Sequence, residues 1–264
     1  MNLKSFIIFV ACVFLLACTP SHEIKKLSGE AQGTTYHISF WSDKPIDTAA
    51  VDKLIKDEFT RIDAEISNYR PDSRIEKLNA TVSSEPLETT PEIIGLVETA
   101  RTVSEASNGC YDLTIKPLFD LWGFKADKLH IPSDEELKNT LQLIGFKQIK
   151  IVDSNHIQKL NPKLRIDLSS IAQGYSVTRM VGILEQHGIH DYLVEIGGEL
   201  QTHGKKPDGS AWRVAVEKPL PDERTMHKIL TIQQTEPLAV MTSGTYRHYF
   251  DQDGKRYSLS LIHI

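Results

Sequence analysis

The chain has 264 residues, of which 40% are hydrophobic and 25% charged, a balance typical of a globular protein with one large domain or two small ones. Its formal net charge is −5, and its basic residues are scattered along the sequence without a Lys/Arg-rich stripe. This pattern argues against nucleic-acid binding, so we expect no nucleic-acid partner.

The N-terminus differs from the rest of the chain. Lys4 precedes an apolar run over residues 6–16, which is shorter than the roughly 20 residues of a membrane-spanning helix. A charged start, a short apolar stretch and a small residue at its end are typical of a secretory signal. Because the sequence LLAC at 15–18 resembles a bacterial lipobox, residues 1–18 are interpreted as a lipoprotein signal peptide with Cys18 as the lipidation site. A plain signal peptide with an incidental cysteine is the alternative.

The cysteine count limits the chemistry of the mature chain. Cys12 leaves with the signal peptide and Cys18 would carry lipid, so Cys110 has no intramolecular partner. We therefore expect neither a disulfide nor a cysteine-based metal site in the mature domain.

The first half of the chain after the signal contains one strand pattern and two helix patterns. Residues 19–27 are expected to form a tether, and residues 34–40 a strand rich in β-branched and aromatic side chains. Asp47 is a candidate N-cap for a helix that keeps its apolar residues on one face. A second helix is expected over 91–108, where proline occupies the first helical position.

The second half of the chain mixes the two patterns without a regular repeat. Ser133 and Glu136 form a capping-box pattern before a helix that Gly145 would close. Another helix is expected over about 171–187. The expected strands are 148–152, 164–168, 192–196, 211–217, 227–233 and 246–250. This mixed order predicts an α+β fold, with helices packed on mixed or antiparallel sheets and no confident domain boundary.

The common catalytic signatures are absent from the sequence, which has no GxGxxG, P-loop, HExxH or GxSxG motif. His187 and His190 are interpreted as surface residues. Six local clusters stand out instead, rich in glycine, hydroxyl and acidic residues. They cover residues 29–36, 67–79, 108–124, 166–175, 195–199 and 242–247.

In this order the six clusters resemble the ApbE family, whose members are bacterial FAD:protein FMN transferases. The most specific part is the run 167–175 with EIGGE at 195–199 downstream. The resemblance implies an ApbE-like α+β domain over residues 28–258. This domain would transfer FMN from FAD to a Thr or Ser hydroxyl of a partner flavoprotein subunit and release AMP, with Mg²⁺ as the divalent cation. The implied acceptors are subunits of Nqr- or Rnf-type redox complexes, and the implied location is lipid-anchored at the periplasmic face of the inner membrane.

The resemblance also carries over individual residues. Ser170 matches a ligand of the divalent cation, at the start of a helix whose free N–H groups suit phosphate oxygens. The alternative for Ser169 and Ser170 is that they act only as helix caps. Tyr69 would stack on the flavin, and the alternative is that it lies at the edge of the core. Trp122 is expected to pack rather than bind. The positions that match FAD contacts are Gln32, Tyr69, Cys110, Tyr111, Asp112, Asp167 and Gln173.

The sequence departs from the family pattern in three places. Gln173 stands where many relatives carry Lys or Glu, and Thr178 where many carry Asp. After Ser258 the family continues with a His and later an Asp that complete the site, whereas residues 259–264 read LSLIHI, which resembles the translation of a sequencing adapter. We therefore expect a non-native tail, an incomplete domain without those two catalytic residues, and no transferase activity in the chain as it stands.

Two other functions remain open from the sequence. One is an FAD pyrophosphatase, in which water takes the place of the acceptor hydroxyl and FMN and AMP are the products. The other is a non-catalytic lipoprotein that binds FAD. Fold alone does not separate these from a transferase.

Overall fold

A five-stranded antiparallel sheet organises the computed structural model, which describes residues 23–124, 128–220, 225–244, 249–252 and 254–258. Every neighbouring pair of strands in this sheet is antiparallel. Its strands, in spatial order, are β1 (Lys25–Ala31), β2 (Thr34–Trp41), β6 (Asp191–Ile196), β7 (Glu199–His203) and β10 (Leu238–Val240).

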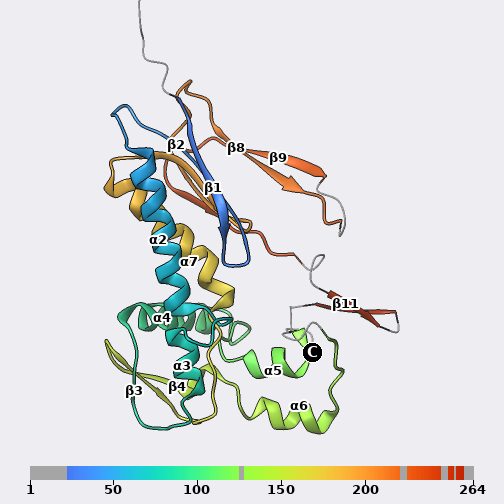
Figure 1. Cartoon of the computed structure of the whole chain (residues 1–264). Helices are drawn as coiled ribbons and strands as arrows, with labels where there is room; N and C mark the ends of the chain where they lie inside the picture. The colour runs from blue at the N-terminus through green and yellow to red at the C-terminus, as the bar shows by residue number, and fades with distance from the viewer. Residues whose placement is uncertain (1–22, 125–127, 221–224, 245–248, 253, 259–264) are drawn as a thin grey trace, which may run out of the picture.

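Two long helices, α2 (Thr48–Ile66) and α7 (Ser169–Gln186), pack against each other and against this sheet (Figure 1). Alternation along β2 explains the packing, because every second residue, namely Tyr36, Ile38 and Phe40, is buried. The α2 helix begins where expected, since Asp47 Oδ1 accepts hydrogen bonds from the N–H groups of the first turn.

The remaining elements surround this core. Among the described residues, four helices and a 3₁₀ turn lie between α2 and β4: α3 (Arg74–Ala80), α4 (Pro91–Ala106), α5 (Lys116–Leu121), α6 (Asp134–Leu141) and the turn Phe146–Gln148. A small sheet has the order β3 (Leu87–Glu88), β5 (His156–Lys159) and β4 (Ile149–Asp153). Two hairpins follow, β8 (Trp212–Glu217) with β9 (Met226–Ile232), and β11 (Tyr249–Gln252) with β12 (Lys255–Ser258).

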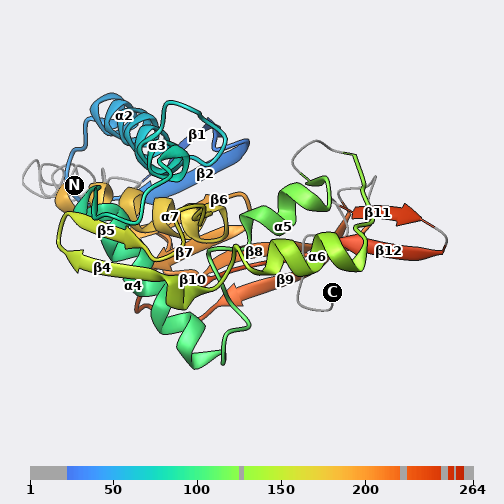
Figure 2. The ribbon, with the colours of Figure 1, turned by 90° about the horizontal axis from the view of Figure 1, so that it is seen from below.

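The last hairpin contacts the chain that follows α5 (Figure 2). The rings of Trp122 and Tyr257 have centroids 5.5 Å apart, and those of Phe124 and Phe250 are 5.2 Å apart. Trp122 is only 5% exposed, which confirms that it packs.

This architecture confirms the α+β prediction and most of the expected elements. The four expected helices are present as α2, α4, α6 and α7, and the strand patterns at 34–40 and 192–196 as β2 and β6. Two boundaries differ. The helix α6 ends at Leu141, well before Gly145, whose φ of +132° instead starts the next turn. The expected tether over 19–27 is shorter at its end, because β1 begins at Lys25 and pairs with β2.

One predicted strand is wrong in an informative way. Residues 164–168 alternate between buried and partly exposed, as a strand would, yet they belong to no sheet. Two asparagine side chains take the place of a neighbouring strand. Asn79 Oδ1 accepts from the Ile166 N–H at 2.7 Å, and Asn68 Oδ1 accepts from the Leu168 N–H at 2.6 Å. Both amide groups also donate to the Ile166 carbonyl. We call Asn68 and Asn79 the asparagine clamp.

A charged cluster links the three long helices. Arg61 of α2 pairs with Glu58 on the same helix and with Glu92 of α4. Arg179 of α7 also reaches Glu58, at 2.6 Å. The hydrogen bond from Arg61, supported by the one from Arg179, lowers the pKa of Glu58 to about 2. Glu58 thus links α2 to α7, and Arg61 links α2 to α4.

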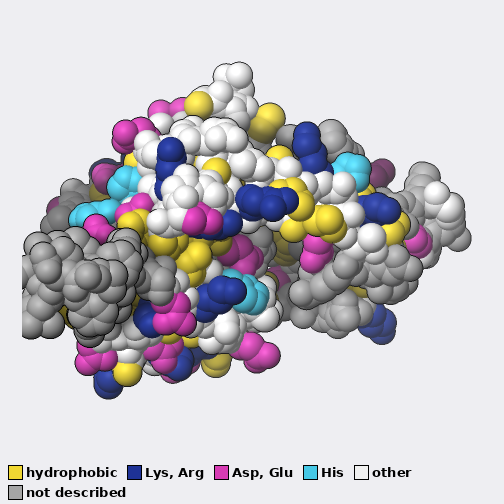
Figure 3. Space-filling model, turned by 90° about the horizontal axis from the view of Figure 1, so that it is seen from above, with side chains coloured by type: hydrophobic (Ala, Val, Ile, Leu, Met, Phe, Trp, Pro, Cys, Tyr) yellow, Lys and Arg dark blue, Asp and Glu magenta, His cyan; other side chains and the backbone are white. Residues whose placement is uncertain are grey.

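Several predictions fall outside the described residues. These are the signal peptide 1–18 with its lipidation site Cys18, and the tail 259–264. In the part of the chain that the structure describes, no helix combines the length and the apolar character needed to cross a bilayer. On the face seen from above, acidic and basic side chains are interspersed (Figure 3). His187 and His190 are both exposed, which confirms their surface position.

Candidate functional site

One end of the five-stranded sheet gathers residues from several of the sequence clusters. The α7 helix runs directly into β6 through a short turn, so its first turns lie near the far end of β6. The β1–β2 turn reaches it there, since Gln32 Nε2 donates to Ser176 Oγ at 2.7 Å. The segment after β10 reaches it too, because a Cβ on Gly174 would lie 3.6 Å from Met241 Cε.

The turn between β6 and β7 completes this end of the sheet. Gly197 and Gly198 have φ values of +59° and +103°, a backbone region that other residues rarely adopt. Space is also short, because a Cβ on Gly197 would lie 2.7 Å from Gln173 Nε2 and 2.9 Å from Thr34 Cγ2. On Gly198 a Cβ would lie 3.8 Å from the carbonyl oxygen of Thr242. The EIGGE cluster is therefore shaped for close approach of three other segments.

The start of α7 is held by Asp167 rather than by its serines. Asp167 Oδ1 accepts from the Ser169 N–H at 2.8 Å, and the Asp167 N–H donates to the Leu113 carbonyl at 2.7 Å. No side chain caps the helix from the N-cap position, Leu168. The alternative in which Ser169 and Ser170 serve only as caps is therefore wrong, and both side chains are exposed at the helix start.

A hydroxyl pair joins the 108–124 cluster to this helix start. The Tyr111 hydroxyl lies 2.8 Å from Ser170 Oγ. Burial is the main reason that the pKa of Tyr111 is raised, the Ser170 hydrogen bond acts against it, and the charges of Asp167 and Asp112 raise it further. The phenol consequently keeps its proton at neutral pH and remains available as a donor.

Asp112 has an internal role that the sequence did not indicate. Its Oδ1 accepts from the N–H and hydroxyl of Thr114, at 2.8 and 2.6 Å, and its Oδ2 accepts from the Phe146 N–H at 2.9 Å. The Gly145 N–H in turn donates to the Thr114 hydroxyl oxygen, at 2.6 Å. The carboxylate of Asp112, a position that matches an FAD contact in the family, is thus already engaged in fixing its own loop.

Tyr69 and Cys110 lie at the surface of the same region. Tyr69 is 82% exposed, so the alternative of a core-edge tyrosine is wrong. It directly follows Asn68, whose amide holds the start of α7. Cys110 is an exposed, free cysteine next to Tyr111. An exposed aromatic ring beside a helix N-terminus has the geometry for stacking on a planar ligand.

The structure thus brings together most of the residues that the resemblance singled out. Tyr111, Asp167 and Ser170 meet at the start of α7, and Gln173 lies one turn further along. Gln32 contacts the next turn, whereas Tyr69 and Cys110 adjoin the site through their sequence neighbours.

Sequence reasoning missed other residues of this site. Asn68 and Asn79 fall inside the 67–79 cluster, yet only the fold shows that they position residues 166–168. Glu199 follows the glycine turn, and burial raises the pKa of its carboxyl group. Glu199 Oε2 and Gln32 Oε1 are buried without a hydrogen-bond partner among the described residues. Two buried acceptors at one end of a sheet suit a ligand that carries N–H groups.

The donor atoms at the start of α7 are compatible with magnesium. Around Ser170 they are the Tyr111 hydroxyl and, near it, the carboxylate of Asp167. Magnesium prefers oxygen ligands and keeps several waters or substrate phosphates in its shell. Over the described ranges, no group of three or more His, Cys, Asp or Glu side chains is arranged to hold a metal. Ser170 would therefore contribute one ligand among several.

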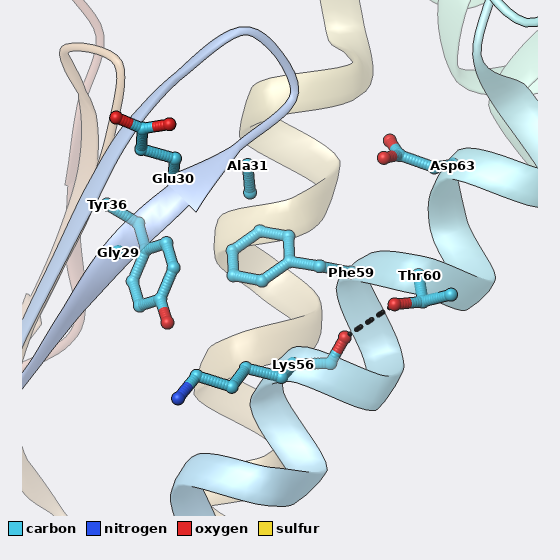
Figure 4. A pocket seen from close by; sticks show the side chains of 8 residues that line it. All are labelled: Gly29, Glu30, Ala31, Tyr36, Lys56, Phe59, Thr60 and Asp63. Carbon is cyan, nitrogen blue, oxygen red and sulfur yellow. Dashed lines mark hydrogen bonds between the residues drawn. The ribbon is translucent and has the colours of Figure 1, made fainter.

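Two pockets lie apart from this helix start. The first has a volume of about 330 Å³ and lies between β1 and α2 (Figure 4). The ring of Tyr36 lies across Gly29 in this pocket, and a Cβ on Gly29 would come within 2.8 Å of that ring. The second, of about 740 Å³, adjoins the loop before Cys110. The first is lined by Gly29, Glu30, Ala31, Tyr36, Lys56, Phe59, Thr60 and Asp63. The second is lined by Arg101, Ser104, Glu105, Asn108, Gly109, Phe146, Lys147 and Ile149.

Comparison with known proteins identifies the family of this chain. The family model described as "ApbE family" matches residues 32–262. The chain belongs to the ApbE family. It is 36% identical over 263 residues to the FAD:protein FMN transferase of Vibrio cholerae, covering 97% of this chain and 77% of that protein. The enzyme of the same name from Haemophilus influenzae is 32% identical, with 97% and 76% covered.

Solved structures of the ApbE family agree with the fold. The flavin transferase ApbE from Vibrio cholerae superposes with a TM-score of 0.78 at 34% identity, covering 90% of this chain and 75% of that one. The apo form of the Pseudomonas stutzeri flavinyl transferase ApbE gives 0.80 at 32% identity, with 91% and 74% covered. The predicted ApbE-like fold and membership of an enzyme family are thereby confirmed.

Proposed function

We propose that this protein transfers FMN from FAD to a threonine or serine hydroxyl of a partner flavoprotein subunit and releases AMP. The observation that carries the proposal is the convergence of separate sequence clusters on the first turns of α7. There an exposed aromatic ring, buried acceptors and a helix N-terminus lie within one region. The ApbE relatives named FAD:protein FMN transferase support the same chemistry.

The flavin ring and the pyrophosphate of FAD have matching elements in this region. The exposed ring of Tyr69 would stack on the isoalloxazine. The start of α7, apart from the Ser169 N–H that Asp167 holds, would receive the pyrophosphate, since a helix N-terminus favours anions. Buried oxygens of Gln32 and Glu199 would accept from N–H groups of the ligand. Magnesium, held in part by Ser170, would neutralise charge on the pyrophosphate.

The reaction is a phosphoryl transfer. The acceptor oxygen forms a bond to the FMN-side phosphorus, the bond from that phosphorus to the bridging oxygen breaks, and AMP leaves with the bridging oxygen. The hydroxyl proton is released, so the products are a phosphoester-linked FMN and AMP. The role of this protein is then chiefly to position FAD and the acceptor, as is usual for this kind of chemistry.

The products decide between this function and its rivals. A version of the protein that carries the family's His and Asp after Ser258 is incubated with FAD, magnesium and a flavin-acceptor subunit of an Nqr- or Rnf-type complex. In-gel flavin fluorescence reports the labelled acceptor, and chromatography reports AMP. We expect both in equal amounts, with labelling lost when the acceptor hydroxyl is removed. AMP with free FMN would support an FAD pyrophosphatase instead, and intact bound FAD would support a non-catalytic binding protein.

We further propose that the protein is a lipoprotein at the periplasmic face of the inner membrane, with lipid on Cys18. The lipobox-like sequence at 15–18 motivates this, and several acyl chains anchor a protein stably where one does not. Intact-mass analysis of the protein extracted from membranes should show a chain that starts at Cys18 and carries the mass of its acyl groups. Cleavage elsewhere, or an unmodified Cys18, would refute the anchor.

A further inference from the structure

The Tyr111–Ser170 contact links two residues to which the family resemblance gave unrelated tasks. Tyr111 was matched to the flavin and Ser170 to the metal, yet their side-chain oxygens are 2.8 Å apart. Such a distance is that of an ordinary O–H···O hydrogen bond. The two residues come from segments 59 positions apart, so the bond depends on the tertiary fold.

Tyr111 is itself held firmly on both sides. Its N–H donates to Ser107 Oγ at 3.1 Å, and the next residue, Asp112, is fixed by its three internal donors. The ring is partly buried and packs against the hydrophobic core. A hydroxyl group whose own position is fixed in this way can orient a neighbouring side chain through a hydrogen bond.

Ser170 is such a neighbour. It is exposed in the first turn of α7, where a free serine would exchange among its rotamers. A hydrogen bond to a fixed phenol selects one of them. The hydrogen bond from the phenol occupies one lone pair of Ser170 Oγ. The second lone pair stays available for a cation, and the hydroxyl hydrogen for a phosphate oxygen.

Resting on the proposed function, we propose that Tyr111 is a positioning residue for the metal and pyrophosphate of FAD. Its hydroxyl holds Ser170 Oγ in the orientation that magnesium requires, so that less conformational freedom is lost when the FAD–magnesium complex binds. The ring of Tyr111 remains free to contact the flavin, so the two tasks are carried by different atoms of one side chain.

The test separates the hydroxyl from the ring. FAD binding is followed by fluorescence while magnesium is titrated, for the wild-type protein and for Tyr111→Phe. We expect Tyr111→Phe to need about threefold to tenfold more magnesium for half-maximal FAD binding, as the loss of one hydrogen bond implies. The same titration without magnesium gives the reference affinity of each protein for FAD.

A double-mutant comparison shows whether the hydroxyl acts through Ser170. Ser170→Ala alone should weaken the magnesium response at least as much as Tyr111→Phe. Adding Tyr111→Phe to Ser170→Ala should cause no further loss, because the group that Tyr111 positions is already gone. Two losses that simply multiply would overturn the proposal.

Tyr192→Phe is the matched control. The Tyr192 hydroxyl donates to Glu185 Oε1 at 2.8 Å, near the opposite end of the same helix. Removing it should leave the magnesium response unchanged, even if the unfolding temperature falls. A Tyr111→Phe variant with wild-type magnesium dependence would overturn the positioning role alone. FAD binding that ignores magnesium in the wild-type protein would overturn this role and the metal site together, whereas the flavin-transfer proposal falls only if the acceptor is not labelled.

Discussion

Tyr69→Ala should weaken FAD binding by at least about tenfold, because stacking on an aromatic ring is worth roughly 1–3 kcal/mol. The side chain is 82% exposed and makes few contacts within the protein, so its loss should barely change the free energy of unfolding. Titration of FAD fluorescence gives the dissociation constant, and a denaturant titration gives the stability of the same sample.

Tyr69→Phe is the appropriate control for this variant. It keeps the ring and removes only the hydroxyl, so affinity for FAD should stay close to that of the wild-type protein. Equal losses in Tyr69→Phe and Tyr69→Ala would mean that the hydroxyl matters and stacking does not. Wild-type affinity in Tyr69→Ala would place the flavin elsewhere.

Asn79→Ala should produce the largest loss of stability among the site residues, roughly 2–4 kcal/mol. Asn79 is 5% exposed, and its amide bonds the Ile166 N–H, the Ile166 carbonyl and Glu76. Alanine would leave the buried Ile166 N–H without a partner. FAD affinity should fall as well, because the segment that carries Asp167 loses half of the asparagine clamp. Denaturant unfolding and FAD titration together measure the two effects.

Asn161→Ala provides a comparison for the loss of an asparagine amide. The Asn161 side chain also bonds backbone groups, the Gln142 carbonyl and the Lys163 N–H, but it does so within a more exposed loop. We expect a change of about 1 kcal/mol or less and unaltered FAD binding. If Asn79→Ala were no more harmful than Asn161→Ala, the clamp would not be what holds residues 164–168.

The sequence predicted those elements whose signals are local. A capping aspartate and a repeating apolar face are enough to predict α2, and Ser133 with Glu136 form the capping box that opens α6. The β1 strand was missed because KKLSGEA is mostly polar and lies at the sheet edge, where little of it is buried. An edge strand shows its partner only in the folded chain.

The site was predictable only in part, for a similar reason. The alternation of apolar and polar residues over 164–168 favours a strand, but the hydrogen-bond partners of this segment are side chains, and periodicity does not distinguish the two. The functional residues came from family resemblance. The contacts between them, such as Gln32 with Ser176 or Tyr111 with Ser170, join segments 144 and 59 residues apart and follow from the fold.

The asparagine clamp has a consequence for the order of folding. Its bonds to Ile166 and Leu168 span 87 and 100 residues of sequence. Contacts this distant require the closure of long loops and therefore form slowly compared with helices and hairpins. During synthesis from the N-terminus, Asn68 and Asn79 are made well before Ile166 and Leu168, so the clamp cannot form until the later segment has emerged. The proposed FAD site is thus completed late, after α2 and α4 have formed.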